Sequence, residues 1–377
     1  DNNLAIGKAA LGGAVAGGEY NVAIGNYSLD ALTSGDQVVA IGYQAGTNIT
    51  SGANSVFVGY DAGGDITTGE HNVFVGNAAG NGFDTESHNL GIGTDALGGA
   101  VAGGEYNVAI GNYTLDALTS GDDNVAVGYN AAGALQAGAY NVAVGRDALS
   151  TAQGDRYNVA VGYEALKAFN TGTSVNDTEN VAVGVQAGLR VNTGAANTII
   201  GGSAGNNITS GSNNTCLGQG AGGSSSPSNI TTSSNSIVLG NNNVTDASIK
   251  VDWTVTSDKR DKTDVEALTM GLDFVNQLNP VTYRWDMRSD YDDDATPDGT
   301  HKKQKLFSGL LAQDVETLER GYGYKVEDET ALITSKGEDG NYGLTYSKFV
   351  PVLINAVQEL SAQVTTLQQE INTLKGE

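Results

Sequence analysis

A short repeat fills the first two thirds of this chain and constrains its fold more than any other feature. The unit reads Asn, an apolar residue, a small or apolar residue, Ile or Val, and Gly, as in NVAVG at 124–128, and the Asn is present in 11 of the 14 units, with Val38, Ser55 and Ser236 as the departures. Most units are 17 residues apart, two spacings are 18 and two are 22. The 14 closing glycines are Gly7, Gly25, Gly42, Gly59, Gly76, Gly93, Gly111, Gly128, Gly145, Gly162, Gly184, Gly201, Gly218 and Gly240.

Each unit has the pattern of one short strand followed by turns. The β-branched run favours a strand, and the Gly-containing second half favours turns. One unit is too short to bury its apolar side, whereas stacked units bury it between neighbours. Asn at one register then predicts a ladder of side-chain amides, and Gly suits turns with positive φ. A flexible linker is the alternative, but linkers do not keep Ile and Val in register over 14 units.

The repeat NVAIG resembles the head repeats of trimeric autotransporter adhesins and, more closely, the NVAVGY-type repeats of phage tail fibres. The resemblance covers residues 1–245 and implies a mainly β fold, a trimeric left-handed parallel β-roll or solenoid that forms a shaft. The chain begins inside the pattern, so we expect further sequence upstream.

The charge and cysteine content exclude several classes of partner and stabilisation. The formal net charge is −24, spread along the chain, which disfavours nucleic acid and anionic membranes. No apolar run is long enough to span a bilayer, so we expect no membrane insertion. Cys216 is the one cysteine, so no intrachain disulfide forms, and stability must come from packing or oligomerisation.

Some positions inside the repeats invite a functional interpretation. His71 and His88 are 17 residues apart, which predicts neighbouring positions on adjacent coils more than a metal site. Residues 222–236 depart from the unit and predict a protruding loop. The loop is either a site of receptor contact or only an insertion. Tyrosines recur beside the strands, where packing of coil on coil is favoured over a contact surface: Tyr20, Tyr43, Tyr60, Tyr106, Tyr129, Tyr140, Tyr157 and Tyr163.

From about residue 251 the composition changes, and the pattern predicts a small α+β domain. We place a linker at 246–256 and the domain at 257–377. Thr263 and Glu266 form a capping box ahead of a predicted helix that ends before Pro280. Strands are predicted at 250–256 and 281–285, a strand leading into a helix at 305–319, and the start of the last helix in 343–360.

A polar insertion at 287–305 carries four aspartates, Asp292, Asp293, Asp294 and Asp298. They lack the spacing of a calcium-binding loop, so the insertion predicts a solvated loop. We expect no metal and no cofactor in this chain.

The chain ends in a heptad pattern at 353–374 that predicts a coiled coil. Val357, Val364 and Ile371 occupy position a, and the d positions hold Leu353, Leu360, Leu367 and Leu374. β-Branched a residues with Leu at d are the dimer preference. A trimer is expected here because the helix must share the symmetry of the shaft.

The segment SDKRDK at 257–262 resembles the Ser-Asp-x-Arg-x-Lys signature of the endosialidase-type intramolecular chaperone. The later stretches LNPVTYRW (278–285), GLLAQDVE (309–316) and the segment 346–360 resemble the same family. In that family a Ser–Lys dyad cuts its own chain after the trimer has formed. The resemblance assigns those roles to Ser257 and Lys262 and implies a serine peptidase without turnover on external substrates.

The residues themselves agree with that chemistry. Ser is a weak nucleophile that needs a base, and Lys serves as one when burial or nearby positive charge lowers its pKa. We expect Arg260 and Lys259 to add such charge, with Asp258 of the same signature in support. A helix would place Ser257 and Lys262 on different faces, so the segment must be a turn. The expected cut lies at Thr256–Ser257; the alternative is that Ser257 only caps a helix.

Together these features predict a homotrimeric phage tail-fibre shaft or tip located on the virion. Its partners would be an upstream fibre or tail protein and a host cell-surface receptor, with a glycan among the options. A bacterial surface adhesin is the first alternative. A glycan-degrading tailspike is less favoured, because the repeats show only scattered carboxylates.

Overall fold

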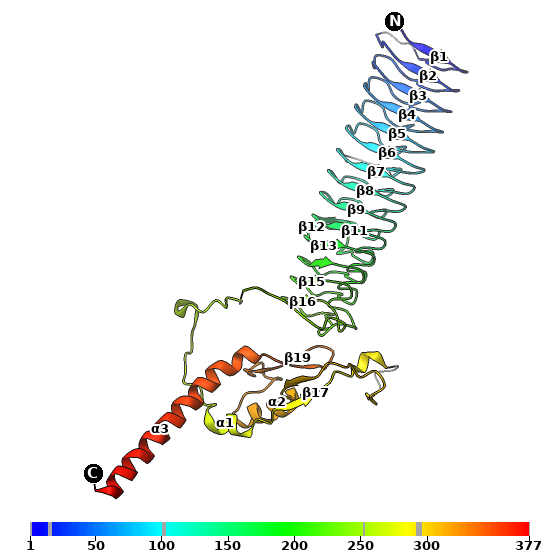
Figure 1. Cartoon of the computed structure of the whole chain (residues 1–377). Helices are drawn as coiled ribbons and strands as arrows, with labels where there is room; N and C mark the ends of the chain where they lie inside the picture. Colours follow the sequence, from blue (N-terminus) through cyan, green and yellow to red (C-terminus); the bar gives the residue numbers. More distant parts are fainter. Residues whose placement is uncertain (1, 14–16, 100–102, 252, 292–295, 377) are drawn as a thin grey trace. The chain divides into compact units, whose positions relative to one another are not determined.

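The computed structural model describes residues 2–13, 17–99, 103–251, 253–291 and 296–376. The chain divides into two compact units, residues 1–243 and 244–377. Figure 1 traces both units in chain order.

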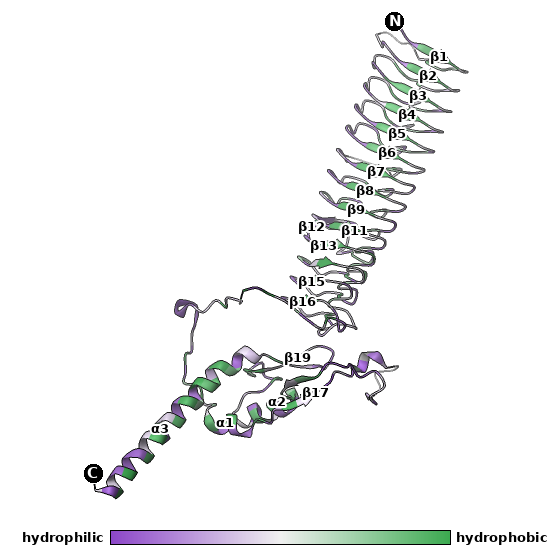
Figure 2. Ribbon diagram, viewed as in Figure 1, coloured by the Kyte–Doolittle hydropathy of each residue, from purple (hydrophilic) through white to green (hydrophobic). Residues whose placement is uncertain are grey.

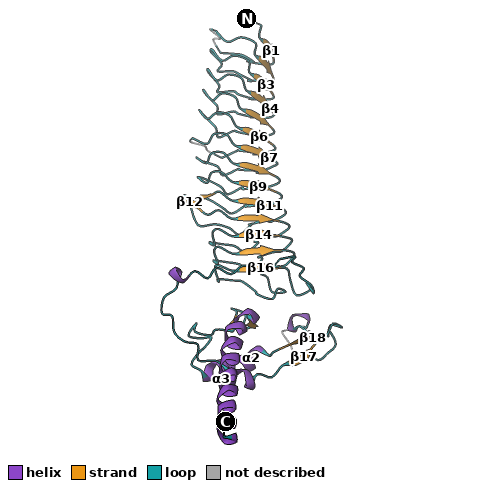
Figure 3. Cartoon of the chain, turned by 60° about the vertical axis from the view of Figure 1, so that its left-hand side comes forward, coloured by secondary structure: helices purple, strands orange, loops and turns teal. Residues whose placement is uncertain are grey.

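The first unit is a parallel β-solenoid with one strand from each coil. Its 14 strands stack in chain order into a single sheet (Figure 3). Neighbours pair in register, so that Val125 lies opposite Val142. The predicted parallel β-solenoid is therefore confirmed. The strands are β1 Leu4–Ile6, β2 Val22–Ile24, β3 Val39–Ile41, β4 Val56–Val58, β5 Val73–Val75, β6 Leu90–Ile92, β7 Val108–Ile110, β8 Val125–Val127, β9 Val142–Val144, β11 Val159–Val161, β13 Val181–Val183, β14 Thr198–Ile200, β15 Thr215–Leu217 and β16 Ile237–Leu239.

The core of this unit is a continuous column of small and apolar side chains. The middle residue of each strand points inward, as do Ala126 and Ala143, because successive side chains of a strand alternate between faces. Leu115 and Leu118 from the turns fill the opposite side of the same coil stack. The first and third residues of each strand point outward and stay partly or fully exposed. Figure 2 shows the strands as a hydrophobic row along the stack.

The asparagines form the predicted ladder. The side-chain oxygen of Asn124 accepts hydrogen bonds from the backbone N–H of Asn141 at 3.0 Å and from its side-chain amide at 3.1 Å. The amide of Asn124 donates to the carbonyl of Gly138 at 3.0 Å and to Asn107 at 3.1 Å. Ser55 takes the same place in its coil and accepts from the backbone N–H of Asn72. The ladder thereby satisfies polar backbone groups that each coil buries.

The closing glycines hold a backbone conformation that other residues rarely adopt. Gly128 has φ +133°, and a Cβ atom there would lie 2.6 Å from the carbonyl oxygen of Gly145 in the next coil. Both the dihedral angle and the close approach of the next coil therefore require glycine.

The two 22-residue coils absorb their extra residues in different ways. In the first, β10 (Asp155–Arg156) pairs with β12 (Asn176–Asp177) as a small second sheet. In the second, Ser226 and Ile230 turn inward and are buried, and Ile230 donates its N–H to Gly222. The prediction that 222–236 protrudes as a whole was wrong, because Ile230 fills the core of its own coil.

The exposed aromatic side chains stack coil on coil. Tyr140 and Tyr157 lie parallel with ring centroids 5.2 Å apart. His71, His88 and Tyr106 continue the same arrangement, with 4.9 Å between successive centroids. The histidines are thus neighbours on adjacent coils, as their spacing predicted. The rings also stay about half exposed, as for Tyr106 at 54%.

The second unit has its own core, formed by three helices and two hairpin-like strand pairs. Met270, Phe274, Val315, Ile333 and Val352 meet there. Strands β17 and β18 pair antiparallel, as do β19 and β20. The predicted strand at 281–285 and the strand-helix at 305–319 are present. The elements are the turn η1 Lys259–Asp261, α1 Leu272–Gln277, β17 Val281–Tyr283, η2 Arg288–Asp290, β18 Phe307–Gly309, α2 Ala312–Gly321, β19 Thr334–Lys336, β20 Tyr342–Leu344, η4 Tyr346–Lys348 and α3 Phe349–Lys375.

Two predicted elements of this unit are absent. The described residues of 250–256 form no strand. The capping box at Thr263 and Glu266 begins no helix, because α1 starts only at Leu272. There the carboxylate of Glu359 from α3 accepts the free N–H of Leu272 at 2.7 Å. A distant side chain thus caps the helix in place of a local one.

Helix α3 buries one face and leaves another open. Phe349, Val352 and Ala356 pack toward the core. The predicted heptad seam faces away from that core, and its members are all exposed: Leu353, Val357, Leu360, Val364, Leu367, Ile371 and Leu374. Among the described helices, none has the length and apolar character needed to cross a membrane.

The ladder predicts a strong effect of a single-atom change at Asn141. Its side-chain amide donates to the carbonyl of Asp155 at 2.8 Å and to Asn124. Asn141→Asp replaces this donor with an oxygen and buries a charge, so the shaft should lose about 2–4 kcal/mol of unfolding free energy. Denaturant unfolding followed by circular dichroism measures it. Asn192→Asp, at an exposed turn position, is the control; equal losses in both variants would contradict a structural ladder.

Candidate functional site

A tight turn places the predicted dyad. Residues Lys259–Asp261 form one 3₁₀ turn that begins at Asp258 and ends at Lys262. The side chain of Asp258 accepts the N–H of Arg260 at 2.9 Å, a common way to start such a turn. Asp258, not Ser257, is therefore the capping residue, so the local geometry does not support the alternative in which Ser257 only caps a helix.

The turn brings the two predicted reactive side chains into contact. The amine nitrogen Nζ of Lys262 lies 2.6 Å from the hydroxyl oxygen Oγ of Ser257. Five residues separate them in sequence, and the extended backbone of Lys262 after the turn directs its side chain back toward Ser257. The distance is short enough for direct proton transfer between the two groups.

The site lies open to water in the single chain. Thr256, Ser257 and Lys262 are all exposed. Burial is the usual means by which a protein makes lysine a base. In the single chain the contact between Lys262 and Ser257 forms without burial of either side chain.

Arg260, expected to add positive charge near Lys262, is paired with an acidic side chain. Its guanidinium pairs with the carboxylate of Asp258, with a shortest distance of 2.6 Å. The hydrogen bonds from Arg260 hold the pKa of the Asp258 carboxyl below its usual value. Because the carboxylate of Asp258 offsets the charge of Arg260, the pair adds little net positive charge near Lys262. Its main effect is to stabilise the turn.

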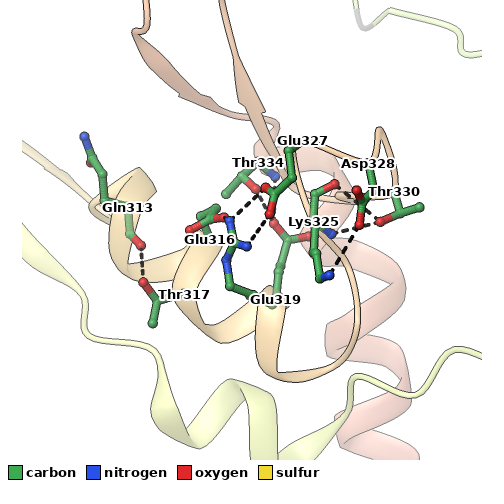
Figure 4. Close-up of polar contacts among 10 residues, drawn as sticks. Gln313, Glu316, Thr317, Glu319, Lys325, Glu327, Asp328, Thr330 and Thr334 are labelled. Carbon is green, nitrogen blue, oxygen red and sulfur yellow. Dashed lines mark hydrogen bonds and ion pairs between the residues drawn. The ribbon is translucent and has the colours of Figure 1, made fainter.

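The buried carboxylate of Glu319, which the sequence did not reveal, connects helix α2 to the segment that leads into β19. Glu319 of α2 is fully buried and accepts the N–H groups of Leu332, Ile333 and Thr334 at 2.8–3.0 Å. It also accepts the hydroxyl of Thr334 (Figure 4). A carboxylate with several donors is a strong anchor inside a protein. Glu319 thereby fastens the segment that enters β19 onto helix α2.

An ion-pair network lies next to this anchor. Arg320 contacts Glu316 one turn earlier on α2 and Glu327 in the following loop. The hydrogen bond from Arg320 lowers the pKa of Glu327 to about 2. Because the folded-state pKa is depressed, this pairing favours the folded state at neutral pH and is lost as pH falls toward 2. The site is exposed, so its contribution is small.

The aspartates of the polar insertion at 287–305 were the other possible metal ligands in the sequence. Among the described residues, no three His, Cys, Asp or Glu side chains gather as a metal site requires. Asp292, Asp293 and Asp294 lie outside the described residues. Asp298 accepts hydrogen bonds from Thr300 and from the hydroxyl of Tyr291.

The buried anchor predicts a large effect of an isosteric change. Glu319→Gln removes the charge and replaces one acceptor oxygen with a donor that faces backbone N–H groups. The second unit should lose about 2–4 kcal/mol of stability, and the amides of Ile333 and Thr334 should exchange with solvent at least about tenfold faster. Hydrogen exchange measured on the full chain tests this. Glu329→Gln, at an exposed position, is the control, and unchanged exchange at Thr334 would contradict the anchor.

Comparison with known proteins assigns part of this unit. Residues 257–331 match the model of the family described as chaperone of endosialidase. The match begins at Ser257 and includes the motifs at 278–285 and 309–316, whereas the segment at 346–360 lies outside it. No curated protein and no solved structure matches the chain. The chain therefore joins a parallel β-solenoid to a segment, residues 257–331, that is similar to the chaperone-of-endosialidase family.

Proposed function

We propose that this chain is the distal part of a homotrimeric phage tail fibre that adheres to a host receptor. Its C-terminal unit directs the folding of the trimer and then cuts itself off at Thr256–Ser257. The contact of 2.6 Å between Lys262 Nζ and Ser257 Oγ, at the first residue of the family match, carries the proposal.

The proposed reaction is an acyl shift followed by hydrolysis. Lys262 takes the proton from Ser257 Oγ, which attacks the carbonyl carbon of Thr256. The peptide C–N bond breaks, the proton moves to the nitrogen of Ser257, and Thr256 is left as an ester on Oγ. Water then hydrolyses the ester, which frees the carboxylate of Thr256 and restores the hydroxyl. The released fragment has 121 residues, 377 − 256.

The open surroundings of the dyad support a requirement for assembly. Lysine becomes a base when water is removed from around it. In the trimer a neighbouring copy would cover the turn, so cleavage follows assembly and does not precede it. This order prevents the chaperone from leaving before its task is complete.

Two exposed apolar rows support the trimer. The outward residues of the strands form one row along the stack, in which Ile41, Val125 and Ile200 are each about 40% exposed and those of other coils are partly buried. The heptad seam of α3 is a second such row. Apolar rows of this length are unusual on a monomer and typical of self-association. Three copies joined by both rows share one axis.

The repeat explains why such a fibre would need a chaperone. Sliding one chain by a whole coil restores nearly the same contacts, so the shaft defines its register weakly. A C-terminal unit that trimerises first sets the register of all three chains. Once the C-terminal unit has been removed, the shaft cannot unfold by the reverse of its folding route. Its unfolding is then slow, which makes the shaft kinetically stable.

Adhesion is proposed for the surface of the shaft. The stacked tyrosines and histidines are half exposed and rigidly held, which suits recognition at low entropic cost. The upstream end would join another fibre or tail protein of the virion.

The proposal predicts the behaviour of dyad variants on a denaturing gel. Wild type should give two pieces, and Ser257→Ala or Lys262→Ala should give the intact chain, since each lacks a reacting group. Lys262→Arg should also stay intact, because guanidinium does not act as a base at working pH. Cleavage should slow as pH falls, because the base must be unprotonated.

The matched control is Lys259→Arg, the same substitution in the same turn, which should be cut at the normal rate. All variants keep their apolar side chains and should assemble like wild type. If Ser257→Ala were cut at the same bond as wild type, the self-cleavage assignment would be wrong, and the C-terminal unit would serve in folding alone.

A further inference from the structure

The turn that carries the dyad is connected only loosely to the rest of its unit. Downstream, residues 263–267 are all exposed, and among the described residues the next hydrogen bond to another element is at the carbonyl of Leu268, which accepts an amide from α3 at 3.1 Å. Upstream, the nearest such bond joins Asp246 to the polar insertion, 257 − 246 = 11 residues before Ser257. Contacts inside the turn therefore determine how close Ser257 lies to Lys262.

The backbone of the turn holds it only weakly. Its two backbone hydrogen bonds, to the carbonyls of Asp258 and Lys259, both measure 3.3 Å, beyond the usual ~2.9–3.0 Å. Long bonds of this kind are typical of the poorer geometry of a 3₁₀ turn. The carboxylate of Asp258 adds a third bond by accepting the N–H of Arg260 at 2.9 Å. It is the shortest of the three, so the turn depends on it most.

Asp258 also pairs with the guanidinium of Arg260, and the two contacts differ in strength. The side chain of Arg260 is 87% exposed, and an ion pair in water contributes little to stability. A side chain that caps the first turn of a helix contributes more. A short polar side chain without charge also caps such a turn, whereas only a carboxylate forms the ion pair. Substitutions at residue 258 therefore separate the two contacts.

We propose that Asp258 is a positioning residue of the self-cleavage reaction, and that it acts through its cap on the turn. The inference rests on the proposed self-cleavage. The carboxylate holds the conformation in which Lys262 Nζ lies 2.6 Å from Ser257 Oγ. Direct proton transfer requires such a distance, so cleavage slows in proportion to the time that the turn spends open. The single chain then forms the geometry of the dyad, and assembly supplies only its cover.

Variants at residue 258 test the cap. Asp258→Ala removes it, and cleavage should slow by about 2- to 30-fold, the effect expected for the loss of a capping side chain. Asp258→Ser and Asp258→Asn keep a capping oxygen but lose the charge, so both should restore cleavage to within about twofold of wild type. The full chain is made by cell-free translation, and the fraction cut is followed against time on a denaturing gel. Light scattering of each variant combined with Ser257→Ala checks that it assembles like wild type.

Two further variants complete the series. Arg260→Gln breaks the ion pair but keeps the backbone N–H that Asp258 caps, so it should slow cleavage less than Asp258→Ala does. Asp261→Ala is the matched control, because it removes a carboxylate from the same exposed turn at a position that is not the cap. It should be cut at the wild-type rate.

The outcomes separate this inference from the proposed function. A wild-type chain that stays intact would refute the self-cleavage itself. Where wild type is cut, cleavage of Asp258→Ala at the same rate would overturn the positioning role alone. Failure of both Asp258→Ser and Asp258→Asn to restore cleavage would overturn the cap, because the rate would then depend on the carboxylate and its ion pair.

Discussion

The structure depends on one constraint, the stacking of each coil on the next in exact strand register. Each strand pairs in parallel with the strands of the neighbouring coils, so each position of the repeat faces the same position one coil away. Asn124 can bond to Asn141 only because their registers agree. Gly128 is held at positive φ because the carbonyl of Gly145 lies against it. The residue before each ladder asparagine, such as Tyr140 with φ 60°, is also left-handed. This conformation is unfavourable for a bulky residue, and ring stacking on Tyr157 offsets part of its cost.

The same constraint leaves an apolar row on the outside of the shaft. Strand residues alternate between faces, so placing Ala126 inside requires Val125 and Val127 to point outward. Their β-branched character suits a strand but also presents apolar surface to water along the whole stack. Such a repeat buries the inward side chains of every coil but leaves the outward apolar side chains of the strands partly or fully exposed. The proposed self-association and the proposed role of the chaperone in setting register both start from that geometry.

The repeat made the first unit predictable, whereas the second depends on contacts that sequence spacing does not reveal. The strand positions, the ladder and the positive φ of Gly128 all follow from a local pattern repeated 14 times. The start of α1 does not, because Glu359 caps Leu272 from 87 residues away and overrides the capping box at Thr263. Glu319 carried no local signal beyond an acidic residue on a helix. The turn that joins Ser257 to Lys262 was predictable, because only a turn brings residues five apart together.

The central claim is that three copies share the apolar rows of shaft and helix, and the mass of the assembled protein tests it most directly. Ser257→Ala prevents the proposed cleavage, so light scattering then measures a single species. The account predicts a mass three times the chain mass of 38.6 kDa, unchanged on dilution over about a hundredfold range. A mass of one chain, or of two, would contradict it.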